Sequence, residues 1–420
     1  MGRKGQEDVA VIGGGIAGMK AALQLAALGR KVTLIEAGPS LGGKAVRGLS
    51  DDKFSKRDAT LDNISTVMMD VEWNKSIKTM TLTTVTGVER DEKTKGFKLK
   101  LLTKARHVYD VCTACQMCVD PCPVTVPNEY SEGVGTRKAV FLPNFYASPR
   151  LYVIDEKTCL WYQDKSCRRC EEVCPVDAIR FDADQKDTPG EVAVDAVVLA
   201  LGASTVGLEA FPQYGAGRLA GVISNAQAMR YLDPAGPTAG KLVLEGGRRP
   251  QTVAFVQARG KAAWGEVGPV TLRWAAETIR AAAADNPAVK VHLFHDKEAG
   301  ASMKGQLIGL NRQLGVEMHD QEVTRVEQKG EGKVSVKWAS EGGEQTLEVD
   351  LAVVSTPTEP PAALKELAGQ FGIKVDAAGY AVPEGRVQVA GPARRPMTLD
   401  EVFDDAMATA GQLVTAFARA

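Results

Sequence analysis

The residues of this chain best suited to chemistry are its eight cysteines, which all lie between Cys112 and Cys174. They form two runs of four, and each run ends in Cys-Pro. The first run has the spacing C-x2-C-x2-C-x3-C and the second has C-x7-C-x2-C-x3-C; the members are Cys112, Cys115, Cys118 and Cys122, then Cys159, Cys167, Cys170 and Cys174. A [4Fe–4S] cluster requires four thiolates, and the first spacing is that of bacterial ferredoxins. The sequence therefore predicts two [4Fe–4S] clusters.

The ferredoxin pattern also suggests which thiolates share a cluster. In two-cluster ferredoxins the fourth cysteine of each run ligates the other cluster. This rule assigns Cys112, Cys115, Cys118 and Cys174 to cluster one, and Cys159, Cys167, Cys170 and Cys122 to cluster two. Spacing alone leaves this exchange open. Zinc and disulfides are the alternatives, but structural zinc sites use more widely separated CxxC pairs, and disulfide frameworks suit small secreted domains.

The long gap in the second run is expected to form a small loop beside cluster two. Trp161 and Tyr162 lie in this loop, and we expect them to shield the cluster from water rather than to carry electrons. Arg168 and Arg169 follow it. A solvated or partner-docking face is the favoured interpretation for these arginines, and the alternative is that they offset the charge of a reduced cluster.

A glycine motif near the N-terminus predicts a dinucleotide site. The motif Gly13-x-Gly15-x-x-Gly18 stands between an apolar strand and an Ala/Leu-rich helix, and the next strand ends at Glu36. The first glycine permits a tight turn, the second lets the backbone approach a pyrophosphate, and the third lets the helix pack on the strand. A purely structural glycine turn is the alternative. The residues expected to contact the cofactor here are Gly13, Gly15, Ile16, Ala17, Gly18, Glu36 and Ala37.

Three further segments favour FAD over NAD in this site. A Gly-Gly-Lys segment follows Glu36 closely, as in flavoproteins that place a second glycine pair near the pyrophosphate. A strand that ends in Ala-Leu-Gly resembles the "ATG" segment of two-dinucleotide flavoproteins. A Val-Ala-Gly segment before the C-terminal helix resembles the one that closes over the ribityl chain, although Pro392 stands where that segment has Asp. The additional expected contacts are Gly42, Gly43, Lys44, Val85, Gly202 and Gly391.

The order of elements predicts an α/β chain, with a two-dinucleotide-binding-type FAD fold and an inserted ferredoxin-like domain for two clusters. β-Meanders are expected at 75–103 and 322–350. The 420 residues and net charge of −1 suit two to three domains and give no reason to expect nucleic acid. The expected domains are the first part of the FAD domain (1–105), the two-cluster insert (106–185), the second part of the FAD domain (186–250), a degenerate NAD-type Rossmann-like domain (251–355) and the C-terminal return (356–420).

The second Rossmann-like region lacks a glycine motif. Its first strand, at 251–257, leads into Ala258-Arg259-Gly260-Lys261 rather than GxGxxG, so a structural or interface role is favoured over nicotinamide binding. The four histidines are scattered through the chain, and each is expected to be a packing or surface residue. They are His107, His292, His295 and His319.

A flavin fold interrupted by a two-cluster segment resembles the flavoprotein component, the A chain, of heterodisulfide reductase. The resemblance covers nearly the whole chain. It rests on the glycine motif from Val11 to Gly18, Cys122-Pro123-Val124, Val126 to Glu129, Gly135 to Pro143 and the spacing of Cys159 to Cys167. Ser50 to Asn63 contains no cysteine, where methanogen members carry some, and no C-terminal ferredoxin extension is expected. These differences bring the chain closest to the corresponding flavoprotein of the quinone-interacting membrane-bound oxidoreductase of sulfate-reducing bacteria.

The resemblance implies an oxidoreductase component that relays electrons between a membrane quinone-linked partner and a soluble adenylylsulfate reductase. The implied partners are a second flavoprotein or iron–sulfur protein and a membrane quinone-reactive protein of the same complex, and electron bifurcation or confurcation is left open. A cytoplasmic location is expected, with attachment to the inner face of the membrane through partners left open. The alternatives are a related component of sulfur oxidation, a free-standing NAD(P)H-dependent iron–sulfur flavoprotein, and a scaffold whose flavin never turns over.

Overall fold

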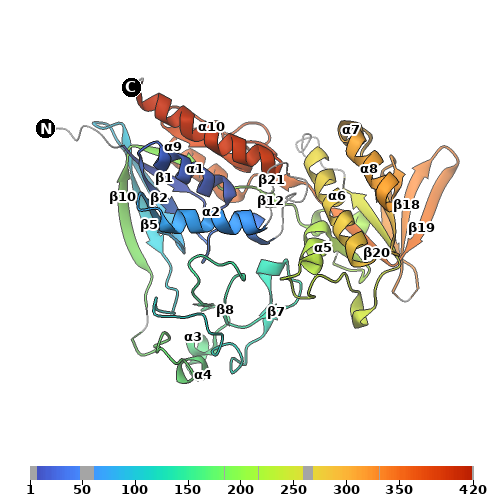
Figure 1. The fold of residues 1–420 in the computed structure, drawn as a ribbon, viewed down its shortest axis with the longest axis horizontal. Helices are drawn as coiled ribbons and strands as arrows, with labels where there is room; N and C mark the ends of the chain where they lie inside the picture. The colour runs from blue at the N-terminus through green and yellow to red at the C-terminus, as the bar shows by residue number, and fades with distance from the viewer. Residues whose placement is uncertain are drawn as a thin grey trace. The chain divides into compact units, whose positions relative to one another are not determined.

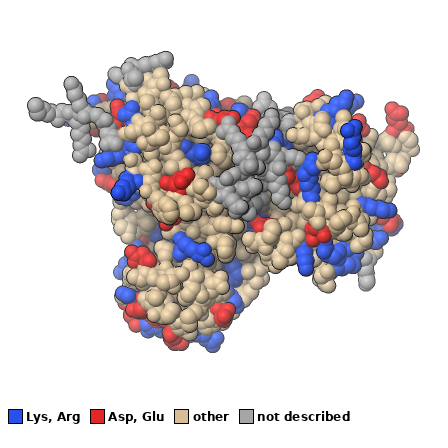
Figure 2. All heavy atoms as spheres, in the orientation of Figure 1, with Lys and Arg blue, Asp and Glu red and all other residues tan. Residues whose placement is uncertain are grey.

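The computed structural model describes residues 7–47, 61–183, 185–215, 217–258, 268–330 and 332–418. The chain forms two compact units (Figure 1). Unit 1 contains the N-terminal residues to Arg47, the segment that ends at Gly202 and the C-terminal segment from Pro360. Unit 2 contains Ala203–Glu359. On the face drawn in Figure 2, acidic and basic side chains are interspersed, in keeping with the net charge of −1.

Unit 1 is built on a five-stranded parallel sheet with the order β22-β11-β1-β2-β3. Successive residues of its central strand face opposite sides, as a strand requires. Val9 and Val11 pack into one hydrophobic cluster, and Ala10 and Ile12 pack into another. The strands are β1 (Asp8–Ile12), β2 (Lys31–Ile35), β3 (Ile77–Met80), β11 (Ala196–Leu199) and β22 (Val387–Val389).

The two faces of this sheet are covered differently. Three helices share the first cluster with the sheet, namely α1 (Ile16–Ala27), α2 (Leu61–Trp73) and α10 (Leu399–Ala418). The other face is covered by helix α9 (Ala362–Phe371) and an antiparallel sheet with the order β10-β5-β4. The strands of that sheet are β4 (Thr83–Asp91), β5 (Gly96–Thr103) and β10 (Thr188–Val194).

The cysteine-rich segment connects two adjacent strands of this antiparallel sheet. Thr103 at the end of β5 pairs with Thr188 at the start of β10, so the segment leaves and returns at the same point. Asp187 accepts a hydrogen bond from the Ala105 N–H, and Gln185 accepts bonds from the N–H groups of Arg106 and His107. The segment has little regular structure. It contains β6 (Val126–Pro127), β7 (Thr136–Arg137), β8 (Val140–Phe141), β9 (Val153–Ile154), α3 (Leu160–Asp164) and α4 (Arg169–Glu172).

Unit 2 has a related layered architecture. Its five-stranded parallel sheet has the order β13-β20-β14-β15-β16, with strands β13 (Val222–Ser224), β14 (Thr252–Gln257), β15 (Lys290–Phe294), β16 (Glu317–His319) and β20 (Leu351–Ser355). One face packs against α5 (Asn225–Leu232), α6 (Gly268–Asp285), α7 (Lys297–Ser302) and α8 (Lys304–Leu314). The other packs against an antiparallel sheet of β17 (Val323–Gln328), β18 (Val334–Ser340) and β19 (Gly343–Val349).

Two sequence expectations about the fold need correction. The segment 203–250 was assigned to the FAD domain, but it lies in unit 2 because β13 pairs with β20. The segment 75–103 was expected to be a β-meander throughout, but β3 joins the parallel sheet of unit 1 beside β2. Arg259 to Lys261, which stand where a GxGxxG motif would continue, lie outside the described residues.

Candidate flavin and iron–sulfur sites

The glycine motif forms the turn between β1 and α1, and its first and third glycines are required by close packing. A Cβ atom on Gly13 would overlap the carbonyl oxygen of Ala200, and its φ of +112° also disfavours a side chain. A Cβ atom on Gly18 would overlap the carbonyl oxygen of Gly13. These two glycines therefore allow the helix, the turn and β11 to meet.

Gly15 differs from its neighbours because nothing in the protein requires a glycine there. Its φ of −72° and ψ of −178° suit any residue, and a Cβ atom would meet no heavy atom within 4 Å. Gly15 is the N-cap of α1, and no side chain caps this helix end. The N-terminus of a helix presents N–H groups and positive potential, which together favour a bound phosphate. Open space above an uncapped helix end is what a pyrophosphate needs.

The second glycine pair lies against this turn. Gly42 forms a bridge with Gly15, and its N–H donates to the carbonyl oxygen of Gly14 at 2.9 Å. The structure also brings Gly391 to the helix start, where a Cβ atom on it would lie 2.6 Å from the Cβ of Ala17. The glycines that sequence analysis singled out at three separate points thus lie at one helix end, and Gly202 is two residues beyond Ala200, which contacts Gly13.

Glu36 holds the loop at residues 36–43, which we call the flavin loop, and it is also available for a ribose. Its two carboxylate oxygens accept hydrogen bonds from the N–H groups of Gly14 and Gly38, both at 2.6 Å. Burial raises the pKa of this carboxyl group, and the two N–H donors oppose that effect. Each oxygen retains a lone pair that a ribose hydroxyl could use. The N–H of Thr83 bonds to the Glu36 carbonyl oxygen, which places the start of β4, and Val85 two residues on, beside it. Ala37 is exposed.

Lys44 follows the second glycine pair, and its ammonium group is partly withdrawn from water. Burial lowers the pKa of Lys44 to about 8; Glu132 opposes this effect, and Arg47 adds to it. A group with this pKa is charged at pH 7 and largely neutral above pH 9. A nearby phosphate would favour the charged form.

We therefore expect FAD affinity to fall as the pH rises from 7 to 10. A pyrophosphate near Lys44 would raise its pKa, so binding would take up a proton above pH 8 and would weaken by up to about tenfold per pH unit. Titration of FAD into cluster-loaded protein at several pH values tests this. Lys44→Arg should bind equally at all of them, because arginine stays charged. A decline in Lys44→Arg that matches the wild type would contradict the assignment.

The charges that act on two buried thiols, Cys118 and Cys170, bear on how the eight cysteines are grouped. The pKa of Cys118 is raised to about 12 by burial, and then by the charges of Cys112, Cys115 and Cys174. The pKa of Cys170 is raised to about 12 by burial, and then by the charges of Cys159, Cys118, Cys122 and Cys167. The charge of Cys174 on Cys118, and that of Cys122 on Cys170, favour the two groups that the ferredoxin pattern predicts. We call these groups quartet one (Cys112, Cys115, Cys118, Cys174) and quartet two (Cys159, Cys167, Cys170, Cys122).

The quartets lie in the hydrophobic core of the inserted segment. Cys118, Cys122, Cys159 and Cys170 are buried, whereas Cys115 is exposed. Backbone N–H groups donate to two sulfurs, from Ala114 to Cys112 at 3.4 Å and from Ala178 to Cys174 at 3.2 Å. Such bonds help to set the reduction potential of a cluster bound to those sulfurs.

The aromatic and basic residues after Cys159 pack as follows. Trp161 stacks on Phe181 with ring centroids 5.0 Å apart, and Tyr162 meets Phe181 edge-on at 6.0 Å. Both rings pack against the core that holds the quartets, as shielding residues would. Arg168 forms ion pairs with Glu171 and Asp182, so its charge is matched within the segment.

Arg106 connects the two sites, and sequence analysis missed it. Its buried guanidinium donates to the Pro39 carbonyl oxygen at 2.7 Å, the Thr81 hydroxyl at 3.0 Å and the Leu151 carbonyl oxygen at 3.3 Å. Burial lowers the pKa of Arg106 to about 10, and the nearby charge of Cys112 opposes this. The side chain therefore lies between the flavin loop and quartet one.

Two more contacts join the flavin loop to the cysteine-rich segment. The Leu41 N–H donates to the Ser148 carbonyl oxygen at 2.8 Å, and the Ser148 N–H donates to the Ser40 hydroxyl at 3.0 Å. Burial of an otherwise ordinary arginine and serine is the only signal of this role, and a sequence does not show burial directly.

Asp405 was also missed: it accepts a bond from the Gly391 N–H at 2.7 Å and thereby fixes the turn beside α1.

Replacement of Arg106 by lysine should loosen the flavin loop. Lysine cannot make the three divergent bonds, so buried carbonyl oxygens lose donors, at a cost of about 1–3 kcal/mol. We expect flavin to be released at lower urea concentration, as measured by the appearance of flavin fluorescence. Arg180→Lys, at an exposed position of the same segment, is the matched control and should behave as wild type. Release of flavin at the same urea concentration from both variants would show that Arg106 does not hold the flavin loop.

His107 is a packing residue, as expected from the sequence. It is buried, with one ring nitrogen bonded to the Tyr162 hydroxyl and the other to Glu156, both at 2.7 Å. It therefore fixes the helix that follows Cys159.

The class of protein follows from this fold and glycine turn, and comparison with known proteins agrees. Residues 8–114 match the family "FAD dependent oxidoreductase". The fold is similar to that of thioredoxin reductase from Lactococcus lactis, with a TM-score of 0.51, 14% identity and coverage of 99% of this chain and all of that one. The chain therefore carries an FAD-dependent oxidoreductase domain in a mixed α/β fold.

The sequence relatives indicate a narrower class, because those most similar include the A chains of heterodisulfide reductases. The chain is 33% identical over 252 residues to that of the H(2):CoB-CoM heterodisulfide,ferredoxin reductase of Methanothermobacter thermautotrophicus, covering 60% of this chain and 37% of that one. It is 29% identical over 372 residues to that of the Ferredoxin:CoB-CoM heterodisulfide reductase of Methanosarcina mazei, covering 85% and 45%. The chain is thus a homologue that spans less than half the length of these relatives.

Proposed function

We propose that this chain binds one FAD and two [4Fe–4S] clusters and passes electrons between them and partner proteins. The observation that carries the proposal is the position of two thiol quartets in the same compact unit as the glycine turn, joined to it through Arg106. FAD exchanges two electrons and each cluster exchanges one, so the bound groups would link two-electron to one-electron chemistry.

The residues around α1 fit FAD. The uncapped N-terminus of the helix and the open space at Gly15 suit the pyrophosphate, and Glu36 has lone pairs for the ribose. Gly42 and Gly43 bring a second stretch of backbone to the same point, and Lys44 follows them with an ammonium group that is charged at neutral pH. Ile16, Ala17, Val85, Gly202 and Gly391 complete the proposed contacts.

The thiol quartets fit four-iron clusters better than zinc. In a tetrahedral zinc site, Zn–S bonds of 2.3 Å hold the sulfurs about 3.8 Å apart. Among the described residues, the one group of three or more metal-ligand atoms within 4.8 Å of one another contains no cysteine. A cluster holds its thiolates farther apart, because each bonds a different iron atom.

We infer the order of electron transfer from the residues that lie beside quartet one. Quartet one adjoins Arg106 and Tyr152, and the Arg106 side chain reaches the flavin loop. We therefore place cluster one between the flavin and cluster two. Cys115 is exposed beside the exposed side chains of Val111 and Met117, which gives a docking partner access to quartet one.

The proposed partners are those of a multi-subunit redox complex. The relatives are named as components of heterodisulfide reductases. For this chain we favour the role of the corresponding flavoprotein in a quinone-interacting membrane-bound oxidoreductase, relaying electrons between a quinone-linked membrane protein and adenylylsulfate reductase. A second flavoprotein or iron–sulfur protein would complete the complex, and bifurcation is a variant of this scheme. None of the helices among the described residues is long and apolar enough to cross a membrane.

Cofactor analysis of anaerobically purified protein tests the proposal. About eight iron atoms, eight sulfides and one FAD per chain are expected from two four-iron clusters and one flavin site. Stoichiometric zinc in place of iron, or the absence of flavin after reconstitution with FAD, would refute it.

The main alternative is a free-standing NAD(P)H-dependent oxidoreductase. Fast bleaching of the flavin by NADH in a stopped-flow experiment would support that alternative. We expect slow or no bleaching, because the strand β14 leads into a segment without the GxGxxG motif. A related component of sulfur oxidation is the second alternative. Electron exchange between the bound clusters and adenylylsulfate reductase would support the proposed relay over this alternative.

A further inference from the structure

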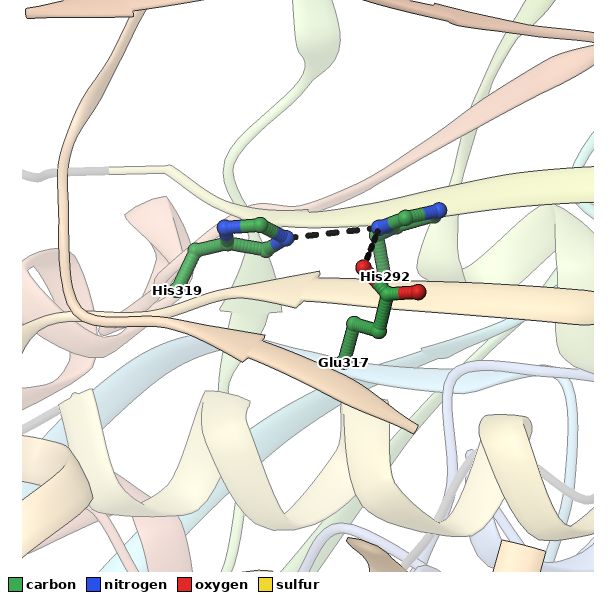
Figure 3. A group of neighbouring side chains, drawn as sticks. All are labelled: His292, Glu317 and His319. Atoms are coloured by element: carbon green, nitrogen blue, oxygen red, sulfur yellow. Dashed lines mark hydrogen bonds and ion pairs between the residues drawn. The ribbon is translucent and has the colours of Figure 1, made fainter. Parts of the chain in front are cut away.

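Three potential metal ligands converge on one edge of the unit 2 sheet (Figure 3). His292 lies on β15, and Glu317 and His319 lie on the adjacent edge strand β16. The parallel register pairs His292 with Glu317 and Phe294 with His319. Because alternate residues of a strand share a face, all three side chains project from the same face of the sheet.

The distances between the ligand atoms fit a single metal ion. His292 Nδ1 lies 3.3 Å from His319 Nε2 and 3.3 Å from a Glu317 carboxylate oxygen. All three ligand atoms lie within 4.8 Å of one another. Two ligands bonded at 2.0–2.1 Å to a tetrahedral zinc ion are separated by about 3.3 Å. Two of the three separations thus match those of ligands that share one zinc ion.

Packing fixes the orientation of the imidazole rings. The ring of His319 stacks on Phe294 with centroids 4.3 Å apart and planes 10° apart, and Trp338 of β18 packs against both. His292 is buried, whereas Glu317 is exposed. The stacked ring of His319 is thus held in place by its aromatic neighbours.

We propose that His292, Glu317 and His319 form a binding site for one divalent transition-metal ion of the zinc type. Two imidazoles and one carboxylate match the ligand preference of zinc, whereas magnesium and calcium prefer oxygen ligands only. The fourth position is open to water, because Glu317 is exposed and β16 is the sheet edge. The site lies in unit 2, and the proposed flavin and cluster ligands lie in unit 1.

Zinc binding to the full chain, loaded with FAD and clusters, tests this proposal. Zinc would be titrated anaerobically against a metallochromic chelator, with one ion per chain expected. His319→Phe keeps a ring between Phe294 and Trp338 but removes the ligand, and Glu317→Gln changes only an exposed side chain. Each should weaken zinc binding by at least about tenfold, as loss of a metal-supporting group does. His295→Gln, at a histidine outside the trio, is the matched control and should bind as wild type.

X-ray absorption at the zinc edge identifies the ligands. Nitrogen and oxygen neighbours at 2.0–2.1 Å, without sulfur at 2.3 Å, are the expected result. Sulfur neighbours would place the ion on thiolates elsewhere and overturn the proposal. Equal zinc binding by Glu317→Gln and wild type would show that Glu317 is not a ligand, and would also overturn it. Failure of the wild type to bind zinc would also overturn it, and would leave the trio as a hydrogen-bonded group.

Discussion

Replacing Cys174 by alanine is expected to remove cluster one, although this residue belongs to the second cysteine run. In the structure the charge of Cys174 acts on Cys118, and the charge of Cys122 acts on Cys170. Cys174→Ala should therefore leave the same remaining cluster as Cys118→Ala. Iron should fall from about eight to about four atoms per chain, because each cluster holds four.

The reciprocal pair makes this test decisive. Cys122→Ala and Cys170→Ala should both lose cluster two, and their EPR spectra should match each other and differ from those of the first pair. Retained FAD in each variant would show that unit 1 still folds. If instead Cys174→Ala resembles Cys170→Ala, each run binds its own cluster, and the exchange is wrong.

Replacing Gly15 by serine should weaken FAD binding without harming the apoprotein. The backbone at Gly15 tolerates any residue, and the space beside it is open. A serine at this N-cap would satisfy N–H groups of α1 and stabilise the helix. The same hydroxyl would occupy the space and the donors that the pyrophosphate needs. We expect FAD affinity to fall by at least about tenfold, which is about 1.4 kcal/mol, with an unchanged or higher melting temperature of the apoprotein.

Gly411→Ala is the matched control for this variant. Gly411 lies within α10 of the same unit, and a Cβ atom there would also meet nothing within 4 Å. Alanine should therefore leave FAD binding unchanged and raise stability slightly. If the Gly15 variant binds FAD as tightly as Gly411→Ala, the pyrophosphate does not lie at this helix end.

Elements with strong periodic or glycine signals were predictable from the sequence. The C-terminal helix and the apolar strand before the glycine motif were both expected, and they are α10 and β1. Long apolar periodicity and the GxGxxG motif make such segments unambiguous. The exchange between the cysteine runs was also expected from the ferredoxin pattern, and it stays a prediction that the cysteine variants above test.

Elements that depend on tertiary pairing were not predictable. Helix α2 was missed because its sequence is rich in Ile, Thr and Val; it is helical because Ile64, Met68 and Val71 pack on the sheet of unit 1. Strand β13 has three residues, so nothing local indicates that it pairs with β20 and moves the unit boundary to Gly202. Helix α9 had an apolar period that could have been recognised.

The sites divide in the same way. Ligand types with fixed spacing, such as the cysteine runs, could be found from the sequence alone. Arg106 and the His292 trio could not, because their partners come from distant residues that only the sheet register and the packing bring together. His292 and His319 were expected to be isolated packing or surface residues, whereas the structure places their ring nitrogens 3.3 Å apart.

The most direct test of the central claim is an anaerobic redox titration of the cofactor-loaded protein, followed by EPR for the clusters and absorbance for the flavin. Our account predicts two magnetically interacting cluster signals and a flavin that is reduced and reoxidised in equilibrium with them. A flavin that stays oxidised at potentials where both clusters are reduced would contradict the account, because the chain would then be a scaffold rather than a relay.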